Sequence, residues 1–84
     1  MYRLVRTTTG RILHATFDHE RHVLAKSWRK KTLLESLHRF YDNMQRLHQM
    51  GTVLSWNSPE SYTARTDSDG WNATMEFTIE KRLL

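Results

Sequence analysis

The sequence predicts a single small α+β domain in which an antiparallel sheet of about five or six strands packs on one central helix. Between residues 32 and 50, apolar side chains recur at spacings of four, three, four and three, which places them on one face of a helix. Residues 71–79 alternate between apolar and polar side chains, as a strand with one buried face does. Each apolar face needs a partner to bury against, and 84 residues suffice for one domain only. We therefore expect residues 1–84 to form one domain with the order ββ(β)αβββ.

The first third of the chain predicts an N-terminal hairpin. Residues 2–8 and 11–17 are rich in β-branched and aromatic side chains, and Thr9-Gly10 between them supplies a turn signal. The polar residues 18–21 predict a second turn. Residues 22–28 then leave two alternatives open, a third strand that extends the hairpin into a meander or a helix, and the short length of the segment favours the strand.

The central helix is predicted with both of its ends. Thr32 followed by Glu35 is a capping-box pattern, in which each side chain bonds a backbone N–H group at the helix start. Gly51 is placed to end the helix in a left-handed conformation. The apolar face of this helix consists of Leu33, Leu37, Phe40, Met44 and Leu47.

The remainder of the chain predicts three strands. Residues 52–56 form the first, and Asn57-Ser58-Pro59-Glu60 breaks it. Residues 61–67 form the second, with Tyr62, Ala64 and Thr66 on one face. Ser68-Asp69-Gly70 is a hairpin turn signal, and residues 71–79 are the clearest strand of the chain.

Composition limits the possible functions. The chain has no cysteine, which excludes disulfides and thiolate metal sites. No run of about 18 apolar residues is present, so we expect no membrane span, and without an apolar leader we expect a cytoplasmic protein. The five histidines match no zinc-binding spacing, so we expect neither a metal nor another cofactor. The sequence leaves the oligomeric state open.

The charges are unevenly distributed. Residues 1–31 contain eight Arg and Lys against two acids, whereas the rest of the chain contains five against seven. Such an asymmetry indicates an anionic partner for the N-terminal part. Candidates for phosphate or carboxylate pairing are Arg3, Arg6, Arg11, Lys26, Arg29, Lys30 and Lys31. Trp28 and Trp56 are candidates for stacking on bases.

These features predict a small non-enzymatic binding module that docks on nucleic acid or on a nucleic-acid-handling complex. Two alternatives stay open. One is a stoichiometric protein inhibitor, of the kind that mobile elements or phages carry, which would bind through the acidic residues Asp67, Asp69 and Glu76 of the C-terminal hairpin. The other is a small ribonuclease-type enzyme with His14 or His22 in acid–base catalysis.

Overall fold

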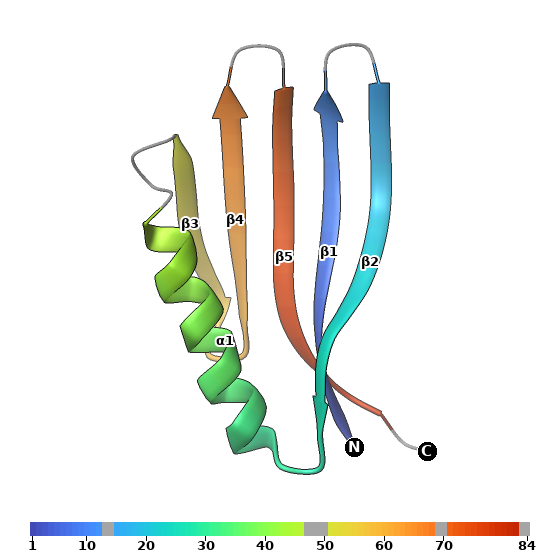
Figure 1. Cartoon of the computed structure of the whole chain (residues 1–84), viewed down its shortest axis with the longest axis vertical. Helices are drawn as coiled ribbons and strands as arrows, with labels where there is room; N and C mark the ends of the chain where they lie inside the picture. Colours follow the sequence, from blue (N-terminus) through green and yellow to red (C-terminus); the bar gives the residue numbers. More distant parts are fainter. Residues whose placement is uncertain (13–14, 47–50, 69–70, 83–84) are drawn as a thin grey trace.

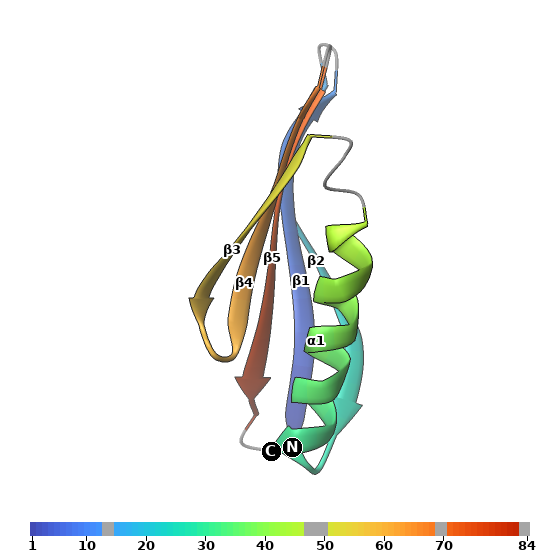
Figure 2. The ribbon, with the colours of Figure 1, turned by 90° about the vertical axis from the view of Figure 1, so that its left-hand side faces the viewer.

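The computed structural model describes residues 1–12, 15–46, 51–68 and 71–82, and of residues 11, 12, 15–19, 68 and 71 it describes the backbone alone. Within this part of the chain, one helix lies on one face of a five-stranded antiparallel sheet (Figures 1 and 2). The elements are β1 (Tyr2–Ile12), β2 (Ala15–Ser27), α1 (Lys30–Gln45), β3 (Thr52–Ser58), β4 (Ser61–Ser68) and β5 (Trp71–Lys81). The order ββαβββ confirms the predicted α+β class.

The strands follow the order β2-β1-β5-β4-β3 across the sheet, and every neighbouring pair is antiparallel. The first strand therefore pairs with the last, at the centre of the sheet. Two antiparallel steps restore the direction of the chain, so β2, β5 and β3 all run the same way and end at the same end of the sheet. The helix begins at that end as well, directly after β2 (Figure 1).

The core lies between α1 and the covered face of the sheet. Leu33 and Leu37 on the helix are buried against residues of the three central strands, and Phe40 and Met44 pack at the margin, as the predicted apolar face requires. The sheet contributes the buried residues Leu4, Tyr62, Ala64, Phe77 and Ile79. Full burial of one large apolar side chain contributes about 1.5–3 kcal/mol, so each large member of this small cluster adds appreciably to the stability.

The helix starts earlier than the capping box predicts. It begins at Lys30, so Thr32 and Glu35 lie inside it, and the capping-box prediction is wrong. Arg29 is the N-cap residue and makes no side-chain cap, but its backbone N–H donates to the Ser27 hydroxyl at 3.0 Å. Lysine has a higher helix propensity than threonine, so the two lysines extend the helix toward β2.

Gly51 has the predicted left-handed backbone, with φ of +86°, but it does not end the helix. The helix ends at Gln45 with Arg46 as its C-cap, and residues 47–50 lie outside the described part. Gly51 instead directly precedes β3. Besides the left-handed backbone, the available space favours glycine, because a Cβ atom there would stand 3.2 Å from the Asp67 carbonyl oxygen.

Both turns predicted in the first third are wrong. Thr9 and Gly10 lie within β1 and pair with Thr74 and Ala73 of β5. Residues 18–21 lie within β2, a single strand of 13 residues, so residues 22–27 continue the second strand and form neither a third strand nor a helix, and Trp28 follows the strand. The long β5 gives β1 a partner at every position, and this pairing outweighs the local turn preference of a Thr-Gly step.

The three C-terminal strands confirm the prediction. Tyr62, Ala64 and Thr66 are buried on one face, and Ala73, Phe77 and Ile79 are buried beside them. The strand β3 continues through Ser58, so only Pro59 and Glu60 separate it from β4. Asp69 and Gly70 of the predicted hairpin turn lie outside the described residues.

Candidate functional site

The end of the sheet where α1 begins gathers exposed cations from three segments. Tyr2 pairs with Ser27 of β2 on one side and with Lys81 of β5 on the other. The Arg82 backbone N–H donates to the Met1 carbonyl at 2.8 Å, which holds the end of β5 beside the chain start. We call this region the basic pole and define it by its exposed residues Lys26, Trp28, Arg29, Lys31, Lys81 and Arg82.

The five cations of the basic pole make no ion pair with any carboxylate of the described residues. Two acids near this end form ion pairs with cations that are not part of the basic pole. Glu60 pairs with Lys30, which joins the helix start to the turn between β3 and β4. Glu80 pairs with Arg21 and lies 3.6 Å from Arg3. The remaining positive charge at the basic pole is therefore not neutralised within the described part of the protein.

Trp28 projects its indole from the basic pole. It follows the last residue of β2, and 70% of its surface is exposed. Among the described large apolar side chains it is the most exposed. An indole so placed keeps its ring faces available for a flat ligand.

The cations predicted to form one basic surface are divided by the strand period. Arg3 and Arg6 lie on opposite faces of β1, because successive strand residues alternate between faces. Arg3 lies on the helix-free face beside Glu80. Arg6 is opposite Phe77 on the helix-bearing face, and its Nε atom is buried without a hydrogen-bond partner in the described part of the chain. The Arg11 side chain lies outside the described part.

Lys81 and Arg82 belong to the basic pole although the sequence did not place them there. Lys81 ends β5 and Arg82 follows it, so their place at the end of a strand could be predicted from the sequence. The residues beside them could not be predicted, because nothing in the sequence says that the last strand pairs with the first. The basic pole also contains Lys26, Arg29 and Lys31, which the sequence predicts as anion-binding residues.

Trp56 is part of the aromatic packing and does not stand free as a stacking surface. Its ring centroid lies 5.1 Å from that of His38, 4.9 Å from that of Tyr41 and 5.1 Å from that of Tyr62. These contacts hold Trp56 against the helix at the side of the sheet. Of the two predicted stacking residues, only Trp28 is unengaged by another ring of the described chain.

The predicted acidic surface contains a cation. Asp67 and Glu76 lie on the helix-free face of β4 and β5, and Arg65 stands between them on the same face. Glu76 also accepts a hydrogen bond from the Thr78 hydroxyl at 3.3 Å. Asp69 lies outside the described residues. The described carboxylates therefore do not form a continuous acidic patch.

Of the two histidines predicted for catalysis, the structure describes His22, which lies opposite Arg6 of β1. His22 is exposed on β2, and His14 lies outside the described part. Within the described residues, no three His, Cys, Asp or Glu side chains lie close enough to hold one metal ion. No helix of the described chain is long and apolar enough to cross a membrane.

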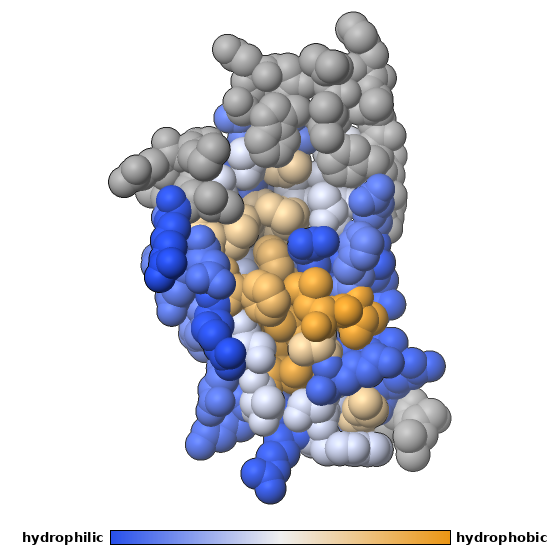
Figure 3. Space-filling model, in the orientation of Figure 1, coloured by the Kyte–Doolittle hydropathy of each residue, from blue (hydrophilic) through white to orange (hydrophobic). Residues whose placement is uncertain are grey.

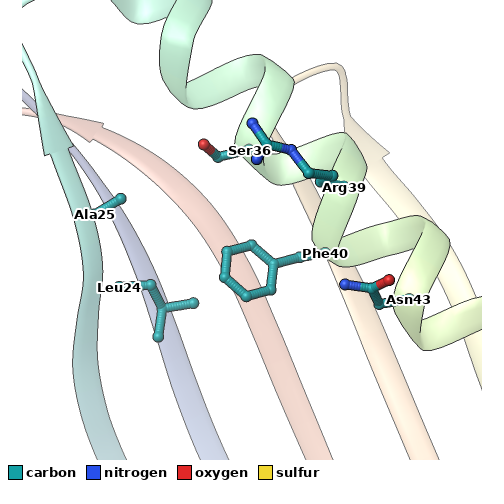
Figure 4. Close-up of a pocket in the computed structure, with 6 residues that line it drawn as sticks. All are labelled: Leu24, Ala25, Ser36, Arg39, Phe40 and Asn43. Atoms are coloured by element: carbon teal, nitrogen blue, oxygen red, sulfur yellow. The ribbon is translucent and has the colours of Figure 1, made fainter.

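A groove separates α1 from β2 on the helix-bearing face. It has a volume of about 290 Å³, and Leu24 and Phe40 approach each other across it (Figure 4). A bulge at Leu24 interrupts the pairing of β2 with β1, so Leu24 and Ala25 both turn toward the helix. Figure 3 shows the result, an apolar surface beside the polar outer side of the helix. The helix side of the groove consists of Ser36, Arg39, Phe40 and Asn43.

No family model, no curated protein and no solved structure matches this chain.

Proposed function

We propose that this protein is a non-enzymatic binding module that docks on nucleic acid, or on a nucleic-acid-handling complex, through the basic pole. One observation carries the proposal. Five exposed cations from three separate segments lie at the end of the sheet that also carries an exposed tryptophan, and no described carboxylate pairs with them. A polyanion with flat rings is the partner that matches both features.

The chemistry predicts how the partner is held. Lysine and arginine side chains contact phosphates and release their condensed counterions, so they supply affinity without sequence preference. Stacking on Trp28 adds energy for any unpaired base, because every base has a π-face. We therefore expect binding that weakens steeply with salt and depends little on base sequence.

The first experiment removes three cations of the basic pole together. We expect Lys26→Gln, Arg29→Gln and Lys31→Gln to weaken binding of a fluorescein-labelled oligonucleotide, measured by fluorescence anisotropy at several salt concentrations. The slope of log K against log salt concentration should fall by roughly two to three, since each lost phosphate contact removes about 0.7–0.9. All three side chains are exposed, so the fold should remain intact.

The matched control removes the same charge elsewhere. Arg39, Arg46 and Arg65 are also exposed and make no ion pair with the described residues, and they lie outside the basic pole. Their replacement by glutamine should leave the salt slope close to that of the wild type. Equal losses in the two triple variants would show that total charge, and not the basic pole, governs binding. Failure of the wild type to bind any oligonucleotide would reject direct nucleic-acid binding.

A second experiment concerns Trp28. Trp28→Ala should reduce affinity for a single-stranded oligonucleotide by roughly 1–3 kcal/mol, or about five- to 150-fold, and leave the salt slope unchanged. Trp28→Phe should restore part of the loss because it retains an aromatic face. An alanine variant with wild-type affinity would remove stacking from the proposal.

The third experiment separates nucleic acid from a complex that handles it. The tagged protein is used to capture partners from lysate, with and without nuclease treatment. If nucleic acid alone is the partner, the proteins that the triple variant fails to capture should also be lost from the wild-type capture after nuclease treatment. A set of proteins that survives nuclease but is lost in the triple variant would indicate docking on the complex itself.

A further inference from the structure

The two edge strands of the sheet differ in their number of charged side chains. β2 forms one edge, and its described side chains include the exposed residues Glu20, Arg21 and Lys26. The bulge at Leu24 also breaks its regular pairing. Charged side chains and bulges are the devices with which proteins protect an edge strand from pairing with another chain.

β3 forms the other edge and lacks this protection. The strand Thr52–Ser58 contains no charged residue. Val53 is 59% exposed on the helix-free face, and Trp56 is 36% exposed on the opposite face. An unprotected edge with exposed apolar side chains is a template for one more strand.

Both faces of the sheet are hollowed along β3. On the helix-free face, Val53, Ser55 and Asn57 border a depression of about 280 Å³. Beside the helix, Val53, Leu54 and Tyr41 border a second one of about 380 Å³. An added strand would therefore find room for its side chains on either face.

We propose that β3 pairs with β3 of a second copy of this chain, antiparallel and about a two-fold axis, which joins the two sheets into one of ten strands. A two-fold interface places each residue against the same strand of its partner, so a charged edge would oppose its own charges. The uncharged β3 meets no such repulsion, whereas β2 carries charged side chains of both signs and a bulge that interrupts its pairing. The inference does not depend on the proposed function.

The register follows from the regular part of the strand. The pairing of β3 with β4 is regular from Thr52 to Trp56 and then shifts. The midpoint of this segment is Leu54, and placing the two-fold axis there uses all five regular residues of each copy. Leu54 then meets its own counterpart, and Val53 of each copy lies opposite Ser55 of the other.

The interface is small, so the dimer should be reversible. Two short paired strands with their flanking side chains bury less than about 1,200 Å², which is the range of weak protein contacts. We expect the weight-average mass to rise from that of one chain to that of two as the concentration increases from micromolar to hundreds of micromolar. Sedimentation equilibrium measures this directly.

Two charged variants at the β3 edge test the location. Val53→Lys and Ser55→Glu should each remain monomeric over the whole concentration range, because each places uncompensated charges in the interface. The matched control is Val23→Lys on the opposite edge, where the native side chain is also exposed, and it should dimerise like the wild type. Circular dichroism checks that every variant is folded.

Mixing the two β3 variants tests the register. With the axis at Leu54, position 53 of one chain lies opposite position 55 of the other. A mixture of V53K with S55E therefore brings a lysine against a glutamate, and we expect a mixed dimer to form. A wild type that stays monomeric at all concentrations would overturn the proposal. The proposal would also fail if Val23→Lys were monomeric while both β3 variants still dimerised. A mixture that stays monomeric would overturn the proposed register.

Discussion

Replacing Tyr62 by phenylalanine should make the protein more stable, although it removes a polar group from the native side chain. Tyr62 is fully buried, and its hydroxyl has no hydrogen-bond partner in the described part of the protein. Its ring stacks on Phe77 with centroids 4.7 Å apart and meets Tyr41 and Trp56 edge-on. Phenylalanine preserves all three ring contacts and removes only the unpaired hydroxyl.

The expected gain follows from the cost of burying that group. An unpaired buried hydroxyl costs about 1–3 kcal/mol in proteins. Part of this gain is lost again through the slightly smaller side chain, so we expect the free energy of unfolding to rise by about 1 kcal/mol. In a domain of this length, that corresponds to an increase in Tm of roughly 4–8 °C.

Urea unfolding measures this change. The midpoint should move to higher urea while the m-value stays constant, which shows that stability and not compactness has changed. Tyr41→Phe is the matched control, because Tyr41 is only half-buried and its hydroxyl is not among the orphaned buried groups. That variant should lie within about 0.5 kcal/mol of the wild type. A Tyr62→Phe variant less stable than the wild type would show that the hydroxyl is hydrogen-bonded in solution.

The pH dependence gives a second readout of the same side chain. Burial raises the pKa of Tyr62 well above its ordinary value near 10, and the neighbouring Tyr41 acts in the same direction. Above pH 10 the unfolded chain therefore loses the Tyr62 proton while the folded protein keeps it. The unfolded state then binds fewer protons, so the free energy of unfolding falls with rising pH, by up to about 1.4 kcal/mol per pH unit. This contribution should be absent in Tyr62→Phe.

Three further substitutions test the fold by urea unfolding. Leu37→Ala at a fully buried position should cost about 2–5 kcal/mol, and the half-buried Leu34→Ala clearly less; equal costs would contradict the placement of the helix face. Gly51→Ala should cost about 1–2 kcal/mol, because its backbone is left-handed and the added Cβ would crowd the Asp67 carbonyl; a neutral effect would mean that the chain there relaxes. Glu80→Gln should cost less than about 1 kcal/mol, since its ion pair with Arg21 is exposed, and a larger loss would assign a structural role to its contact with the more buried Arg3.

The C-terminal half was predictable because each of its signals is local. Alternation over residues 71–79 and the buried set on β4 depend on the period of two alone. The N-terminal hairpin was predicted, but the position of its turn was not, because Thr9-Gly10 carries a local turn signal that the neighbouring β5 overrides. Residues 18–21 are polar for another reason. They lie on an edge strand, where charged side chains prevent pairing with another chain. A polar edge strand and a polar turn have similar compositions, so the sequence does not distinguish them.

The candidate site was only partly predictable. The separation of Arg3 and Arg6 was available from the sequence, since positions three apart on a strand fall on opposite faces. The arrival of Lys81 and Arg82 at the same end of the sheet as Lys26 was not, because it depends on β5 pairing with β1. Local patterns give the faces of each strand, whereas the order of strands in a sheet is a tertiary property.

Two ion-pair sites at this end of the molecule bind acids that the basic pole does not contact. Glu60 joins the helix start to the turn between β3 and β4, and Glu80 joins Arg3 of β1 and Arg21 of β2 to β5. Both acids thus serve contacts between elements, and neither can neutralise the basic pole as well. At physiological salt, screening confines the field of the exposed cations to about 8 Å. If the proposed function holds, the basic pole should therefore attract an anion mainly at contact. We then expect the slope of log K against log salt concentration to depend on a few local residues.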